Sequence, residues 1–392
     1  MHIRTKKDAL NMRALVFFLT MEIALYMFNS DKYMQLSGFY LPLILAIGIG
    51  FLKMIKSVAN KRRLESIQKI CIVLLVLFLL SAIVNIKSIN RGYFLSYLVG
   101  ICLLVELSRI NFSAEMLEKI KNSYVFSAFV ISVLILVLKK RFYALESTRL
   151  TIQIGNGDLI DPNYLAFFLI CPLIICVEKV ISKGIKNIYS PAMLVIFGGV
   201  FMTGSRGAFL SVAIAVIYLF FAHPRIKQIF IHPQDKRKRR KYIFGLLVIL
   251  VVGIFLIPQE TMQRLFEIDT WMGDSSNVRR FELWSNAIKV IIKRPIIGYG
   301  AAHTGQIIGQ VLGKFEPAHN TFLEMALQCG TLFVIAFIIM CCKIFIMKRN
   351  KLSKSICIAT LIAGIFISAE ATLALWLNLG ISIALIRGGN DE

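Results

Sequence analysis

Residues 70–84 read ICIVLLVLFLLSAIV and contain no charged side chain. About 20 apolar residues in a helix span a bilayer, so this run and its flanking residues predict a transmembrane helix. Similar runs recur along the 392 residues, of which 57% are hydrophobic and 17% charged, whereas soluble domains carry about 25% charged residues. The sequence therefore predicts an integral membrane protein and excludes a large soluble domain.

The apolar runs predict an all-α, polytopic membrane protein with about 12 transmembrane helices. The predicted spans cover residues 14–28, 39–52, 70–86, 92–108, 123–138, 161–178, 190–203, 207–222, 242–258, 321–342, 355–368 and 371–387. The chain is thus divided into residues 1–258 with the first nine spans, a long polar loop over residues 259–320, and residues 321–392 with the last three spans.

The net charge of +23 is distributed as in a membrane protein. If the N-terminus is cytoplasmic, 30 of the 45 Lys and Arg residues fall on the cytoplasmic side, the asymmetry that sets membrane orientation. The basic run 236–241 belongs to one of these segments, so a nucleic-acid partner is not expected. Both termini are predicted to be cytoplasmic, and the loop 259–320 is predicted to be extracytoplasmic. The eight cysteines lie mostly in apolar runs, without the spacing of a zinc site.

The long extracytoplasmic loop is expected to contain an amphipathic helix. The four residues 274–277 (Asp-Ser-Ser-Asn) are typical helix-capping residues. The apolar positions that follow recur at helical spacing, namely Phe281, Trp284, Ile288 and Ile291. We therefore predict a helix that lies at the membrane surface and ends before Pro295.

Arginines in two places are candidates for binding an anion. Arg279 and Arg280 lie in the first turn of the predicted surface helix, where a cation opposes the helix dipole unless an anionic partner is bound. Contact with anionic lipid head groups is the alternative explanation, and it is favoured for Arg279. Arg206 lies at the tip of a tight hairpin between two short spans, beside Gly204 and Ser205, where a ligand can approach the backbone closely. Its alternative role is an interface anchor.

His319 immediately precedes the span 321–342, where its imidazole could accept a proton at the mouth of the helix bundle. Glu324 lies one turn into that span and could orient the imidazole or face a cavity. Asp161 precedes Pro162, and an Asp cap followed by Pro explains this helix start without a functional role. No metal-binding or hydrolase motif stands in the outer segments, so no metal and no cofactor are expected.

A set of short motifs between about residues 155 and 332 resembles the O-antigen ligase and Wzy-type polysaccharide polymerase family. The motifs are FMTGSRGA at residues 201–208, Arg280-x-x-x-Trp284, Pro295-x-x-Gly298-x-Gly300, His319-Asn320 and Gly330. The Asp161-Pro162-Asn163 start of one span is similar to the polymerase members.

The resemblance implies a GT-C-like membrane glycosyltransferase of the bacterial cytoplasmic (inner) membrane. Such enzymes act on the extracytoplasmic face, on glycans carried by undecaprenyl diphosphate, without a metal. It implies that Arg206 and Arg280 bind the donor diphosphate, with Arg279 beside them, and that His319 activates the acceptor hydroxyl. An imidazole with an ordinary pKa near 6.5 suits that task at neutral pH. Glu324 and Asp161 are possible supporting residues.

The sequence leaves three functions open. The first is a polymerase that extends a lipid-linked repeat unit in O-antigen, capsule or exopolysaccharide biosynthesis, favoured by the Asp161 motif. The second is an O-antigen ligase that passes the glycan to a lipid A core or another surface acceptor. The third is a flippase or transporter for lipid-linked sugars, which the scarcity of charged residues at span centres disfavours. The expected partners are the lipid-linked donor, the glycan acceptor and membrane lipid, with a chain-length regulator and a flippase as further candidates.

Overall fold

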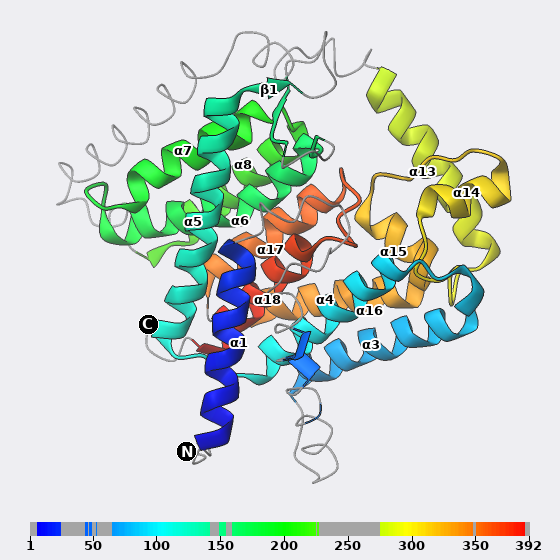
Figure 1. Cartoon of the computed structure of the whole chain (residues 1–392), viewed down its shortest axis with the longest axis horizontal. Coiled ribbons are helices and arrows are strands. Elements are labelled where there is room, and N and C mark those ends of the chain that lie inside the picture. The colour runs from blue at the N-terminus through cyan, green and yellow to red at the C-terminus, as the bar shows by residue number, and fades with distance from the viewer. Residues whose placement is uncertain are drawn as a thin grey trace. The chain divides into compact units, whose positions relative to one another are not determined.

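The computed structural model describes residues 6–24, 44, 45, 47, 48, 52, 65–141, 149–153, 159–224, 226, 275–347 and 350–388. The predicted span 242–258, most of the span 39–52, the basic run 236–241 and residues 259–274 of the loop lie outside the described residues. The described part is mostly helical, as predicted (Figure 1).

The first part of the described chain contains the α-helices α1 (Lys6–Ala24), α3 (Ser66–Val84), α4 (Arg91–Arg109), α5 (Ala114–Leu138), α6 (Pro162–Lys183), α7 (Tyr189–Met202) and α8 (Arg206–Ala222). The helices of the second part are α13 (Ser275–Lys293), α14 (Thr304–Leu312), α15 (Thr321–Cys329), α16 (Thr331–Ile346), α17 (Lys351–Gly364) and α18 (Leu373–Gly388). By length and composition, α3, α4, α5 and α6 could each cross a membrane, and α7, α8, α16 and α18 are shorter apolar helices.

The structure corrects the all-α expectation at one place. β1 (Lys140–Arg141) and β2 (Leu150–Thr151) form a short antiparallel pair, in which Lys140 lies opposite Thr151. The hydroxyl of Thr151 also hydrogen-bonds the backbone oxygen of Ile160, so the pair is tied to the residues just before α6. Two-residue strands carry almost no period-2 pattern, and the apolar runs alone could not predict them.

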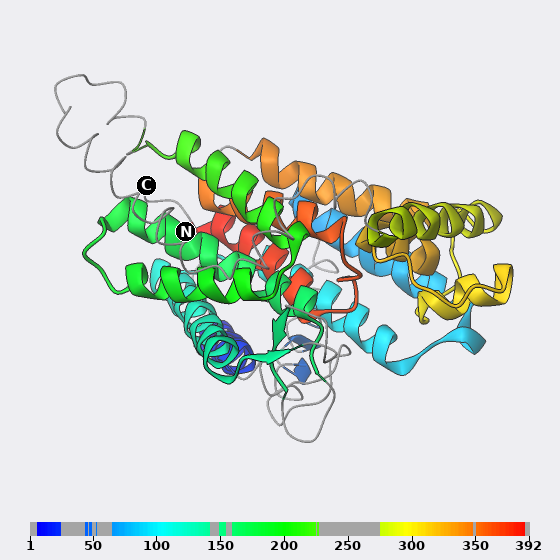
Figure 2. The same cartoon turned by 90° about the horizontal axis from the view of Figure 1, so that it is seen from above.

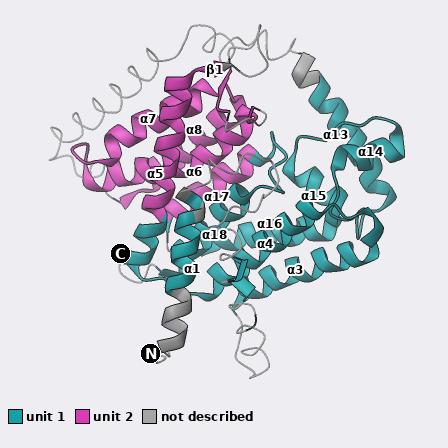
Figure 3. Cartoon of the chain, viewed as in Figure 1, with its two compact units in different colours: residues 1–120, 272–350, 364–392 teal, residues 121–271, 351–363 magenta. Residues whose placement is uncertain are grey.

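The chain forms two compact units, each discontinuous in sequence (Figure 3). Unit 1 contains residues 1–120, 272–350 and 364–392, and unit 2 contains residues 121–271 and 351–363. In unit 1, α4 packs against both α3 and α18. Gly100 of α4 makes this packing possible, because a Cβ atom there would lie 2.3 Å from the ring of Trp376. In unit 2, α6 packs against α7 and α8.

The predicted span 321–342 is divided in the structure. α15 ends at Cys329, and Gly330 separates it from α16 with φ 84°. The turn that follows α13 packs against this break: Thr331 N–H donates to the Pro295 carbonyl at 2.7 Å, and Tyr299 N–H donates to the Leu327 carbonyl at 2.8 Å. The break is therefore a docking point for the loop, and apolarity alone could not reveal it.

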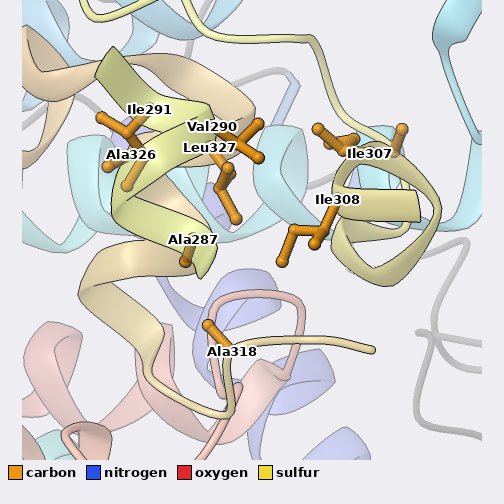
Figure 4. Packing of buried hydrophobic residues seen from close by; sticks show 9 residues of the cluster. Ala287, Val290, Ile291, Ile307, Ile308, Ala318, Ala326 and Leu327 are labelled. Carbon is orange, nitrogen blue, oxygen red and sulfur yellow. The ribbon is translucent and has the colours of Figure 1, made fainter. Parts of the chain in front are cut away.

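The helix predicted before Pro295 is present as α13, and its place at the membrane surface stays a prediction. Both views place α13, α14 and α15 together at one end of unit 1 (Figures 1 and 2). Their shared core is shown in Figure 4 and contains Ala287, Val290, Ile291, Ala302, Ile307, Ile308, Ala318, Ala326 and Leu327. Ala318 is fully buried in this cluster, so the core fixes the backbone one residue before His319.

Candidate active site

The segment that carries His319 is tied to α13 by a hydrogen bond. The indole N–H of Trp284 donates to the backbone carbonyl of Ala318 at 3.0 Å. On the other side of His319, the Asn320 side chain caps α15 by accepting from the N–H groups of Phe322 at 3.0 Å and Leu323 at 3.2 Å. The histidine is thus held between two fixed neighbours.

His319 has a left-handed backbone, with φ 51°, which is uncommon for a residue other than glycine. Its backbone N–H donates to Oε1 of Glu324 at 3.0 Å, and the Ser368 hydroxyl donates to the same oxygen at 2.8 Å. Glu324 is fully buried. The prediction that Glu324 acts on the imidazole is not tested by these contacts, which show instead that its carboxylate holds the His319 backbone.

Arg280 and His319 line one pocket of about 320 Å³. The pocket is formed by the first described turns of α13 and by residues 316–319. The guanidinium of Arg280 is half-buried and lies over the Phe366 ring, with 5.9 Å between its Cζ atom and the ring centroid. Such stacking restricts a guanidinium without neutralising it. His319 is exposed and therefore accessible from this pocket.

Arg279 lines the same pocket but is paired with a carboxylate. Its Nε donates to Glu316 Oε2 at 3.3 Å, and its Nη2 bonds Oε1 of the same residue. The hydrogen bond and charge of Glu316 raise the pKa of Arg279 above its usual range. Arg279 therefore already has an anionic partner within the chain.

Glu370 adds a second buried carboxyl near Glu324, in the segment between α17 and α18. Glu370 is 1% exposed, and its backbone carbonyl accepts a hydrogen bond from the indole N–H of Trp376 at 2.9 Å. Burial, and next the charge of Glu324, raise the pKa of Glu370 well above the usual range of a carboxyl. The environment therefore favours the protonated, uncharged form of Glu370.

Unit 2 holds the hairpin tip with Arg206, and the structure confirms the predicted turn. α7 ends at Met202, Gly204 has φ 59°, and α8 begins at Arg206. Two features favour glycine at position 204. Its backbone is left-handed, and a Cβ atom there would lie 3.2 Å from the side chain of Arg149.

Arg149 is a residue of unit 2 that sequence reasoning missed. Its Nε donates to the Thr203 carbonyl at 3.0 Å, and its Nη2 donates to Asn163 Oδ1 at 2.8 Å. Its side chain is 13% exposed. It therefore joins the hairpin tip to the start of α6. No motif or spacing marks this arginine, which becomes recognisable only when β2 places it beside the turn.

Asp161 serves as the cap of α6, which confirms the structural interpretation of this residue. Its Oδ1 accepts from the Asn163 N–H at 2.8 Å, and Pro162 occupies the first helical position. The same oxygen lies 3.9 Å from Nη2 of Arg149. Asp161 and Arg206 belong to unit 2, whereas Arg279, Arg280, His319 and Glu324 belong to unit 1.

Comparison with known proteins agrees with the motifs. Residues 191–338 match the family model described as O-antigen ligase. The chain is also 27% identical over 339 residues to the ComP-specific O-oligosaccharyltransferase of Acinetobacter baylyi (strain ATCC 33305 / BD413 / ADP1). That alignment covers 78% of this chain and 58% of the relative, so the chain spans somewhat more than half of the relative's length. The findings confirm the resemblance to the O-antigen ligase-like family, and the matched segment includes Arg206, Arg280 and His319.

Proposed function

We propose that this chain is a membrane glycosyltransferase that moves a glycan from an undecaprenyl diphosphate carrier to a hydroxyl of an acceptor. One observation carries the proposal. Arg280, which can bind a phosphate, and His319, which can accept a proton, line the same pocket of about 320 Å³. The apolar helices and the family resemblance support a multi-pass protein, which we place in the bacterial inner membrane with this pocket on the extracytoplasmic face.

The two side chains fit the two halves of glycosyl transfer. The acceptor hydroxyl gives its proton to the neutral imidazole of His319, and the acceptor oxygen forms a bond to the anomeric carbon of the donor. The bond between that carbon and the phosphate oxygen breaks, and the electron pair leaves with the diphosphate. The guanidinium of Arg280 stabilises the negative charge that develops on the leaving group. The reaction needs no oxidant or reductant.

The remaining predicted residues take secondary roles in this proposal. The family resemblance supports Arg206 as a second diphosphate-binding arginine. Arg279 is assigned to the pocket wall rather than to the diphosphate, since Glu316 already pairs with it. Glu324 is a positioning residue that acts through the His319 backbone. Asp161 acts as a helix cap.

The choice of acceptor separates two versions of the activity. Transfer to a surface acceptor other than the growing glycan, as by a ligase, is favoured by the two named comparisons. Polymerisation onto a second lipid-linked repeat unit was favoured by the Asp161 motif, and that support weakens because the Asp161 carboxylate caps α6. We therefore place the ligase-type reaction first and keep the polymerase as the second candidate.

The test is reconstitution of the full chain in liposomes with an undecaprenyl-diphosphate-linked oligosaccharide and EDTA. Either a second lipid-linked repeat unit or a lipid A core is supplied as acceptor. A single addition to the core indicates a ligase, and a product ladder indicates a polymerase. We expect Arg280→Ala and His319→Ala to reduce transfer by about 100-fold or more, the usual effect of losing a charge-stabilising group or a general base.

Lys293→Ala is the matched control, since it removes an exposed cation from the last turn of the same helix. It should retain the rate of the unmodified protein. A His319→Ala variant with that same rate would contradict the assignment of the base. If the lipid-linked sugar moved across the bilayer and was transferred to neither acceptor, the protein would be a transporter and not an enzyme.

A further inference from the structure

A second, larger cleft adjoins the pocket that contains Arg280 and His319. Its volume is about 610 Å³, and it shares Arg279 and Glu316 with that pocket. Glu282 and Asn286 of α13 and Lys314 and Phe315 of the loop after α14 also line it. The volume lies within the range of about 300–1,000 Å³ that is usual for small-molecule sites. Nothing in the proposed chemistry requires this second space.

Phe315 provides an aromatic platform in the cleft. The ring lies against the backbone of α14, because a Cβ atom on Gly309 would come within 2.2 Å of its Cδ1 atom. Despite this contact, Phe315 remains 69% exposed. One part of the ring is thus supported by a glycine while much of it stays available to a ligand.

Asn286 is a buried polar residue that lines the cleft. The residue is 6% exposed. The amide can both donate and accept, so it can bind a hydroxyl group in either direction.

Charged groups surround these two residues. Glu282 pairs with Lys314, and Arg279 pairs with Glu316, so each pair joins α13 to the loop. The four side chains are between 43% and 63% exposed, and they keep their hydrogen-bonding groups at the solvent. Such a rim disfavours a lipid tail, because the charges would lose water without gaining partners. Two carboxylates also disfavour a polyphosphate or nucleic acid.

We propose that this cleft binds a pyranose ring of a glycan, with the apolar face of the sugar on Phe315 and its hydroxyl groups on Asn286 and Glu282. A sugar ring combines an apolar C–H face with a rim of hydroxyls, which matches an aromatic platform beside an amide and carboxylates. The assignment deepens the proposed function and rests on it. The ring belongs either to the donor glycan or to the acceptor glycan.

The first experiment measures binding without transfer. The full chain in nanodiscs is titrated with short fluorescent oligosaccharides cut from bacterial capsular polysaccharides and O-antigens, free of any lipid carrier. We expect binding of at least one of them, an affinity about tenfold lower in Phe315→Ala, and recovery in Phe315→Trp. Phe281→Ala is the matched control, since Phe281 is also 69% exposed but packs against Trp284 and does not line the cleft. It should bind as the unmodified protein does.

The second experiment identifies the source of the sugar through steady-state transfer kinetics. A rise in KM for the acceptor alone in Phe315→Ala indicates an acceptor subsite, and a rise for the donor alone indicates a donor subsite. Unchanged oligosaccharide affinity in Phe315→Ala, or no binding to the unmodified chain, overturns the sugar site. If the chain binds the oligosaccharide through Phe315 but shows no transfer activity, the sugar site stands and the proposed enzymatic function fails. The two failures are therefore distinguishable.

Discussion

Replacement of Gly330 by alanine should strongly destabilise the end of unit 1 that holds the candidate site. Gly330 has φ 84° and ψ 166°, a region of backbone conformation that is essentially restricted to glycine. A Cβ atom there would lie 2.0 Å from the Ile296 carbonyl oxygen and 2.4 Å from its carbon. A normal C···O contact is about 3.3 Å or more, so the backbone would have to move by more than about 1 Å.

The expected loss of stability follows from two contributions. The strained backbone conformation costs about 1–3 kcal/mol for a residue with a side chain. The displacement also disrupts the hydrogen bonds from Thr331 to Pro295 at 2.7 Å and from Tyr299 to Leu327 at 2.8 Å. Each such bond contributes about 0.5–1.5 kcal/mol. The free energy of unfolding should therefore fall by roughly 2–6 kcal/mol.

Gly313→Ala is the comparison variant, at a glycine with a positive φ but without a steric neighbour. Gly313 also has a positive φ, 74°, but a Cβ atom there would have no neighbour within 4 Å. It should cost only about 1–2 kcal/mol, the usual penalty of a left-handed conformation. The two variants differ in the contact with Ile296 and in the backbone region, since ψ is 8° at Gly313 and 166° at Gly330.

The assay is thermal unfolding in detergent, followed with a dye that becomes fluorescent on reacting with thiols. Cys329 is buried directly before Gly330, and its exposure contributes to the signal together with that of the other buried cysteines. We expect the transition of Gly330→Ala to lie well below those of Gly313→Ala and the unmodified protein. Equal transition temperatures for the two glycine variants would refute the steric argument.

Two further substitutions test the supports of the candidate site. Glu324→Ala removes the oxygen that accepts from the His319 N–H at 3.0 Å and from the Ser368 hydroxyl at 2.8 Å, and it should lower kcat by about tenfold or more. Glu324→Gln keeps that acceptor oxygen and should retain most of the activity. Equal kcat values for the two variants would show that the His319 backbone needs no such support. Arg149→Lys removes the guanidinium group that donates to the Thr203 carbonyl at 3.0 Å and to Asn163 Oδ1 at 2.8 Å. The variant should have a lower transition temperature in the same dye assay. An unchanged transition temperature would mean that the guanidinium does not stabilise the hairpin tip.

The sequence predicted the helices best where apolar runs or caps mark them. The hairpin between α7 and α8, the cap at Asp161 and the amphipathic α13 all follow from local signals. The division of the span 321–342 did not, because apolar residues continue on both sides of Gly330. α14 and the β1–β2 pair were also missed, since each is short and is fixed by packing rather than by periodicity.

The candidate site was predicted in its residues but not in its contacts. The motif pattern identified Arg280 and His319, which the structure brings to one pocket. The pairing of Arg279 with Glu316 joins residues 37 positions apart, and no local pattern encodes it. The anchoring of the Ala318 carbonyl by Trp284 is likewise a contact between distant residues. Tertiary contacts of this kind decide which groups each of two adjacent arginines meets.

The packing of the motif glycines has a consequence for assigning functions to related sequences. Gly298 and Gly330 allow the loop to dock on the break between α15 and α16, whereas Arg280 and His319 supply the groups proposed for chemistry. An inactive descendant that had lost the arginine and the histidine would still need both glycines in order to fold. A search that scores the glycines therefore recognises a scaffold, and only the two polar side chains distinguish a working enzyme from a pseudoenzyme.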